Sequence, residues 1–180
     1  MILVYLSMIE TQEDKDKFQK IYDQYNGLIK HVARKLTNDE QNIEDIVQET
    51  FLRIVKSIKV LRYENDKEFR SLIGIMTKHC GYRYLSKNKN IITMDSEEYI
   101  DYMNDNIDFE KVIIDKLYLD HIIEMIDSLD MKYQSVLRLS VKGYKSEEIA
   151  AILDISPENV RIRVHRAKKI ILERINKFEK

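Results

Sequence analysis

Apolar residues recur every three or four positions along the first half of the chain, which is the pattern of amphipathic α-helices. The first stripe, within residues 14–36, consists of Phe18, Ile21, Tyr22, Tyr25, Leu28, Ile29, Val32 and Leu36. The second, within residues 42–60, consists of Ile43, Ile46, Val47, Phe51, Ile54, Val55 and Ile58. The third, within residues 66–86, consists of Phe69, Leu72, Ile73, Met76, Cys80 and Tyr84. The pattern therefore predicts three helices over these ranges, with Asn42 as the N-cap of the second.

The periodicity fades between residues 88 and 108, where polar and acidic residues alternate irregularly with apolar ones. This stretch predicts a linker. Further helices are predicted beyond it, at residues 109–127, 131–142, 146–153 and 157–177, and Gly143 suits a helix C-terminus. The predicted fold is all-α, with two small helical domains at residues 1–87 and 109–180 joined by the acidic linker 88–108.

The composition agrees with long helices, because the 180 residues include only one proline and four glycines. The opening segment, MILVYLSMIE, is apolar but about half the length of a membrane span. We interpret it as a short tail or packing segment, and translation starting at Met8 instead of Met1 is an open alternative. We expect no membrane insertion.

The net charge of −1 conceals a segregation of charge along the chain. Residues 94–130 contain twelve acidic residues and two basic ones, whereas residues 161–180 contain eight basic residues and two acidic ones. The distribution of charge along a chain determines its partners more than the sum does. The C-terminal segment is therefore a candidate for contact with nucleic acid.

Nothing in the sequence indicates catalysis. There is no glycine-rich phosphate loop and no CxxC motif, and the four histidines are scattered without the spacing of metal ligands. Cys80 is the only cysteine, which excludes an internal disulfide, fits a reducing cytoplasm, and is typical of a small buried hydrophobe. We expect no catalytic residue, metal or cofactor.

The most specific local pattern is KSEEIAAILDISPENVRIRVHRAKK, residues 145–169. Ser146 can cap a short helix, and Asp154 with Ile155 can form a turn. The tripeptide 156–158, Ser-Pro-Glu, is a strong helix start, with a capping residue, a proline at the first position and an acid in the first turn. The buried face of the last helix is predicted to be Val160, Val164, Ala167 and Ile171.

A short helix, a turn and a basic helix are typical of a helix-turn-helix that reads the major groove. The alternative is a solvated basic helix end.

Three segments of the chain resemble parts of the sigma-70 family of RNA polymerase sigma factors. Residues 145–169 resemble the motif that reads the promoter −35 element, residues 44–58 (EDIVQETFLRIVKSI) the polymerase-binding helix, and residues 68–87 (EFRSLIGIMTKHCGYRYLSK) the helix that reads and melts the −10 element. Their order and spacing resemble the extracytoplasmic-function class, which keeps only regions 2 and 4 of the family. The resemblance covers roughly residues 14–177.

The resemblance implies the partners. Asp45, Gln48 and Glu49 match the positions that contact the β′ coiled coil of core RNA polymerase, and they should face solvent because they lie off the apolar stripe. The β subunit, promoter DNA and an anti-sigma factor that covers both domains are further implied partners. From the residues alone, the same three side chains also fit an ordinary polar helix face.

The resemblance also implies two sets of DNA-binding residues. The −35 set is Arg161, Ile162, His165, Arg166 and Lys169. The −10 set is Tyr63, Asn65, Lys78, His79 and Arg83, with residues 63–66 forming the loop that accepts a flipped base. Tyr84 is assigned to core packing. The chain departs from the family by lacking a tryptophan near Leu72 and a basic residue near Ile75, and by carrying His79 where asparagine is common, which predicts a narrow promoter preference.

Two other functions remain open at this point. A stand-alone helix-turn-helix regulator would use only the C-terminal motif and would need a dimer surface and a palindromic site. An interaction protein that sequesters another factor through its helical faces would need no DNA contact.

Overall fold

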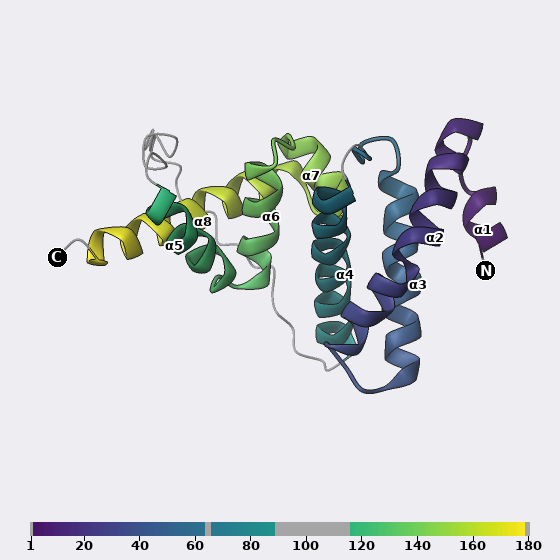
Figure 1. Cartoon of the computed structure of the whole chain (residues 1–180), viewed down its shortest axis with the longest axis horizontal. Coiled ribbons are helices and arrows are strands. Elements are labelled where there is room, and N and C mark those ends of the chain that lie inside the picture. The colour runs from purple at the N-terminus through teal and green to yellow at the C-terminus, as the bar shows by residue number, and fades with distance from the viewer. Residues whose placement is uncertain (1, 64–65, 89–115, 179–180) are drawn as a thin grey trace.

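The computed structural model describes residues 2–63, 66–88 and 116–178, and these residues form eight α-helices and no strand. The helices are α1 (Ile2–Ser7), α2 (Gln12–Arg34), α3 (Glu40–Ser57), α4 (Asp66–Asn88), α5 (Lys116–Asp127), α6 (Met131–Val141), α7 (Ser146–Leu153) and α8 (Pro157–Phe178) (Figure 1). The all-α prediction is confirmed, and the opening segment contains a short helix. The predicted linker lies outside the described residues apart from Asn88, at the end of α4.

The ends of the long helices follow from short polar side chains. Thr11 accepts a hydrogen bond from the backbone N–H of Asp14 and so caps α2. Asp39, with a carboxylate 2.8 Å from the Asn42 backbone nitrogen, caps α3. The prediction that Asn42 caps this helix is therefore wrong, because the carboxylate three residues earlier satisfies the N–H of Asn42 and the first turn begins at Glu40.

Helices α2, α3 and α4 pack into one group around aromatic and branched side chains. Tyr25, Phe51 and Phe69 are among its largest buried residues. Tyr5 brings α1 onto this group, since its ring lies 5.7 Å from that of Phe18 and 5.8 Å from that of Phe51. Lys17 also donates hydrogen bonds to the carbonyls of Ile58 (2.9 Å) and Leu61 (2.5 Å), which satisfies acceptors left at the end of α3.

Helices α5, α6 and α8 share a second apolar cluster. Its buried members are Ile122, Ile126, Leu129, Leu137, Ala167, Ile171 and Ile175. Of the buried face predicted for the last helix, Val160, Ala167 and Ile171 are buried, and Val164 is half-buried. Cys80 is buried, as predicted.

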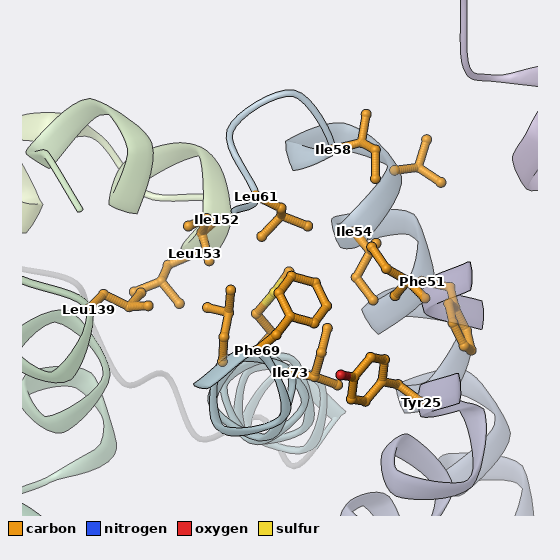
Figure 2. Packing of buried hydrophobic residues seen from close by; sticks show 14 of the residues in the cluster. Tyr25, Phe51, Ile54, Ile58, Leu61, Phe69, Ile73, Leu139, Ile152 and Leu153 are labelled. Atoms are coloured by element: carbon orange, nitrogen blue, oxygen red, sulfur yellow. The ribbon is translucent and has the colours of Figure 1, made fainter. Parts of the chain in front are cut away.

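The two groups of helices pack directly against each other. Helix α7 contacts α3 and α4, and α6 contacts α4, so that α4 stands between the α2–α3 pair and α6–α7 (Figure 1). Figure 2 shows Leu139, Ile152 and Leu153 from the second group beside Leu61 and Phe69 from the first. All five side chains are almost completely buried. One continuous apolar core therefore joins the two groups.

We expect Phe51→Ala to lower the free energy of unfolding by about 3–5 kcal/mol, because truncation of a buried aromatic ring leaves a cavity. Phe51 is 1 % exposed and contacts the rings of Tyr5, Phe18 and Tyr22. Urea unfolding followed by circular dichroism measures the change. The control is Tyr82→Ala, since Tyr82 is 48 % exposed and its loss should change stability by no more than about 0.5 kcal/mol. Equal losses in the two variants would contradict the packing described here.

Candidate nucleic-acid interface

The predicted polymerase-contact residues lie on α3 and are all half-buried, not fully solvent-facing as the sequence suggested. Asp45 accepts a 2.5 Å hydrogen bond from the hydroxyl of Tyr84 on α4. Glu49 lies 3.4 Å from the guanidinium of Arg53, one turn further along the same helix. Neighbouring side chains therefore orient both carboxylates while leaving part of each exposed.

Gln48 faces a different neighbour from Asp45 and Glu49. It lines a cavity of about 160 Å³ between α1, α2 and α3, together with Tyr5, Tyr22, Asn26, Lys30, Arg34, Glu40, Ile43, Glu44, Val47 and Phe51. The basic side chains of this cavity come from α2 and the acidic ones from the first turns of α3. The three predicted residues thus form a half-buried polar row on one face of α3, with Gln48 at its edge toward α2.

The predicted −10 residues are distributed between exposed and covered positions. Lys78 is exposed, whereas His79 is 6 % exposed. The hydroxyl of Tyr63 donates to Gln24 at 2.5 Å, and its ring lies edge-on to Phe69 at 4.9 Å. Asn65 lies outside the described residues, as does part of the predicted base-accepting loop. Tyr84, assigned to core packing, is half-buried and uses its hydroxyl on Asp45.

His79 occupies an unusual electrostatic environment. Burial, which is the largest cause, and the guanidinium of Arg83 lower the pKa of His79 to about 3. The guanidinium groups of Arg163 and Arg53 act in the same direction, while Asp154 opposes them. The imidazole is therefore neutral at pH 7 in this arrangement, because a buried cation beside other cations is unfavourable.

The predicted −35 residues follow one side of α8. Arg161, His165 and Lys169 are exposed, and Ile162 and Arg166 are half-buried. Arg161 also forms an ion pair with Glu147 of α7 at 3.0 Å. The predicted groove-reading side of α8 is thus accessible in this conformation.

The helix-turn-helix has the turn and the second-helix cap that the sequence predicts, but a different cap on its first helix. The Ser156 hydroxyl lies 3.1 Å from the Asn159 backbone nitrogen, so it caps α8. Asp154 adopts a left-handed conformation, with φ of 59° and ψ of 50°, which aspartate tolerates better than most residues. Helix α7 begins one residue after its N-cap, Lys145, whose backbone N–H donates to the Glu148 carboxylate at 2.7 Å. Ser146 is therefore the first helical residue and not the cap, which corrects the prediction made from the sequence.

Asp154 also connects the two groups of helices. Its carboxylate Oδ2 accepts hydrogen bonds from Arg53 Nη2 at 2.6 Å and from Arg83 Nη1 at 3.2 Å. The hydrogen bond from Arg53 is the largest cause that lowers the pKa of Asp154 to about 2, and Arg83 acts in the same direction. Asp154 is therefore ionised at pH 7.

A second polar contact between the groups involves Arg62. Its Nη2 lies 2.8 and 3.0 Å from the two oxygens of Glu148, and its guanidinium lies over the Tyr144 ring at 4.6 Å. The hydrogen bond from the backbone N–H of Lys145 is the largest cause that lowers the pKa of Glu148. The hydrogen bond from Arg62 lowers this pKa further. This contact adds polar complementarity beside the apolar part of the interface.

Sequence reasoning did not single out Arg53, Arg62 or Arg163. The side chain of Arg53 is 5 % exposed, and Arg163 as a whole is 3 % exposed. Arginine is rarely buried without a partner. The available signal for Arg53 was its position four residues after Glu49 on a helix, which predicts a local ion pair but not the contact with Asp154.

Within the described residues, no helix is long and apolar enough to cross a membrane. Among the same residues, no group of three or more histidine, cysteine, aspartate or glutamate side chains is arranged to hold a metal ion.

We expect the free energy of unfolding to decrease as the pH falls below about 6.5. In the unfolded chain His79 is protonated below this pH, whereas in the folded chain it stays neutral down to about pH 3. The contribution of His79 should reach about 2 kcal/mol between pH 7 and pH 5. Asp154 adds a second decrease at lower pH, since its carboxylate is protonated in the unfolded chain below its ordinary pKa of 3.8 but in the folded chain only near 2.

Urea unfolding at pH 7 and pH 5 measures this dependence in the wild type and in His79→Asn. The variant should lose less stability between the two pH values, because asparagine does not titrate. His165→Asn is the matched control, since His165 is exposed. An unchanged dependence in His79→Asn would show that His79 is not buried in solution.

Comparison with known proteins gives the same assignment for both groups of helices. The family model for Sigma-70 region 2 matches residues 21–91, and the model for Sigma-70, region 4 matches residues 119–171. Together the two models cover more than half of the chain. The first match includes α3 and α4 with the predicted polymerase and −10 residues, and the second includes the helix-turn-helix.

Individual relatives match over nearly the whole chain. The ECF RNA polymerase sigma factor SigX of Bacillus subtilis is 21 % identical over 163 residues, covering 87 % of this chain and 82 % of its own. The ECF RNA polymerase sigma-E factor of Haemophilus influenzae is 25 % identical over 174 residues, covering 91 % of this chain and 90 % of its own.

Among solved structures, the sigma factor RpoE in complex with the anti-sigma factor NepR from Bartonella quintana is 17 % identical, with 89 % of this chain and 97 % of that chain covered and a TM-score of 0.38. The assignment rests on the family models and on the relatives matched by sequence. The chain belongs to the sigma-70 family of RNA polymerase sigma factors and is of the extracytoplasmic-function type.

Proposed function

We propose that this sigma factor directs promoter-specific transcription initiation by binding core RNA polymerase through α3 and reading promoter DNA with α4 and α8. The observation that carries the proposal is the combination, in one chain, of a half-exposed polar row on α3 with an exposed basic side of the helix-turn-helix. A stand-alone regulator does not need the polar row on α3, because it does not bind core polymerase.

Each surface suits its proposed partner chemically. Asp45 and Glu49 are carboxylates whose partners on Tyr84 and Arg53 hold them in position, which lowers the entropy lost when a basic helix binds. Arg161 and Lys169 are exposed on α8, where arginine can donate two hydrogen bonds to guanine and lysine can contact phosphate.

The factor acts without chemistry of its own, since it supplies binding and recognition to an enzyme that makes the RNA. It works in the cytoplasm, where core polymerase and promoter DNA are found. We also propose an anti-sigma protein as a partner of the inactive factor, because the RpoE protein of Bartonella quintana was solved with one.

We expect the triple variant Asp45→Ala, Gln48→Ala, Glu49→Ala to lose co-elution with core RNA polymerase, because it removes the polar row on α3. Size-exclusion chromatography of mixtures with core enzyme measures this. The matched control is Gln12→Ala, Glu13→Ala, Asp16→Ala, which removes the same kinds of side chain from exposed positions on α2. Circular dichroism confirms that both variants are helical. Failure of the wild type to co-elute would contradict the proposed function and favour a stand-alone regulator.

We expect Arg161→Ala to reduce specific transcription by about tenfold, because loss of one bidentate arginine contact in the major groove costs this much in affinity. Run-off transcription on a promoter selected from random sequence by the wild-type holoenzyme measures the effect. The control is Lys132→Ala, which removes an exposed base from α6, away from the recognition helix. Equal effects of the two substitutions would contradict the assignment of α8 to the groove.

A further inference from the structure

The carboxylate of Asp154 sits between two guanidinium groups that belong to the other group of helices. Arg53 reaches it from α3 and Arg83 from α4, at 2.6 and 3.2 Å from the same oxygen. Arg83 also donates to the Asp154 carbonyl at 3.2 Å. The turn of the helix-turn-helix therefore presents an anion to a two-arginine site on the first group.

Two arginines converging on one anionic oxygen are also a means of binding a phosphate. Arg83 is among the predicted −10 residues, whereas Arg53 lies in the predicted polymerase-binding helix and has no assigned role toward DNA. Asp154 is the left-handed C-cap of α7 and lies in the turn before α8, which begins at Pro157. A short acidic residue at this position can occupy the place of a phosphate group.

We propose that Arg53 and Arg83 form a binding site for a phosphate of the −10 DNA strand, and that Asp154 fills this site in the closed chain and keeps DNA away from it. The inference rests on the proposed function and adds to it a DNA-contacting residue, Arg53, and an internal competitor for the same site.

The burial of neighbouring residues supports the competition. His79, another predicted −10 residue, is 6 % exposed, and both Asp154 and Arg163 of the second group influence its pKa. Apolar contacts of α7 with α3 and α4 hold the turn in this position. By contrast, Arg161, His165 and Lys169 are exposed. The closed chain thus buries His79 and engages Arg83 with Asp154, although Lys78 and Arg83 stay exposed, while the exposed −35 residues make no contact with Arg53 or Arg83 in this arrangement.

Arg53 also links this site to the predicted polymerase surface. Its Nη2 bonds both Glu49 and Asp154, so the two carboxylates share one guanidinium. A polymerase helix docked on Glu49 therefore approaches the docked turn of the helix-turn-helix. The proposed phosphate site and the predicted polymerase surface therefore share the residue Arg53.

The test measures binding of the free full-length chain to a fluorescein-labelled 12-nucleotide single-stranded DNA of random sequence, by fluorescence anisotropy at low salt. Single-stranded DNA probes the phosphate site without requiring a known promoter. We expect Asp154→Asn to bind about tenfold more tightly than the wild type, because it loses one charge-assisted contact with the two arginines. Asparagine tolerates the left-handed conformation, so the turn is retained.

The matched control is Glu173→Gln, which makes the same change of charge at an exposed position of α8 that belongs to neither predicted set of DNA-binding residues. Its affinity should equal that of the wild type. Asp154→Gly is a second opening variant, since glycine also accepts a positive φ. Addition of Arg83→Gln or Arg53→Gln to Asp154→Asn should abolish the gain, and circular dichroism checks that each double variant is folded.

Three results would overturn the inference. The first is equal binding by Asp154→Asn, Asp154→Gly and the wild type. The second is a gain that persists in both folded double variants, and the third is a gain of the same size in Glu173→Gln. Co-elution of the wild type with core polymerase decides the proposed function separately. If the wild type co-elutes and directs transcription while the Asp154 variants bind DNA no more tightly, only the further inference fails.

Discussion

Helix α4 packs against both groups of helices at once, and the rest of the structure depends on this constraint. Its apolar stripe packs against α2 and α3, and other sides of the helix meet α6 and α7. The residues that become buried include Ile75, Thr77 and His79, which lie off the stripe predicted from the sequence. Lys78, Tyr82 and Arg83 stay exposed, and the second group of helices covers sides of α4 that α2 and α3 leave open.

Polar groups at the junction determine how the two groups fit together. Arg53, Arg83 and Arg62 on one side meet Asp154 and Glu148 on the other, next to the apolar side chains of Leu61 and Leu153. Contacts of this kind are specific because a shifted arrangement would leave a charge without its partner, and they are weak enough to be replaced by other anions. An interface with these properties suits a protein that must bind several partners with the same surfaces.

The folded arrangement explains how a chain with a net charge of −1 carries basic surfaces. A net charge of −1 would be a poor basis for attraction to DNA, but the basic residues gather on α8 while Arg53 and Arg83 are partly neutralised by Asp154. In this conformation the basic side of α8 is therefore available, whereas the charge of the Arg53–Arg83 site is offset by Asp154.

The sequence by itself determined the all-α fold, the stripes of α2 and α3, the turn at Asp154, the start of α8 and the membership in the sigma-70 family, because helical periodicity and capping residues act over a few neighbouring positions. It also located the candidate residues on α3, α4 and α8, whose roles stay predictions. Only the tertiary structure decided that Asp39 and not Asn42 caps α3, that His79 is buried, and that Arg53 meets Asp154, a residue 101 positions away in the chain. These features arise from contacts between groups that are distant in sequence, and no local pattern encodes which charged side chain will face which.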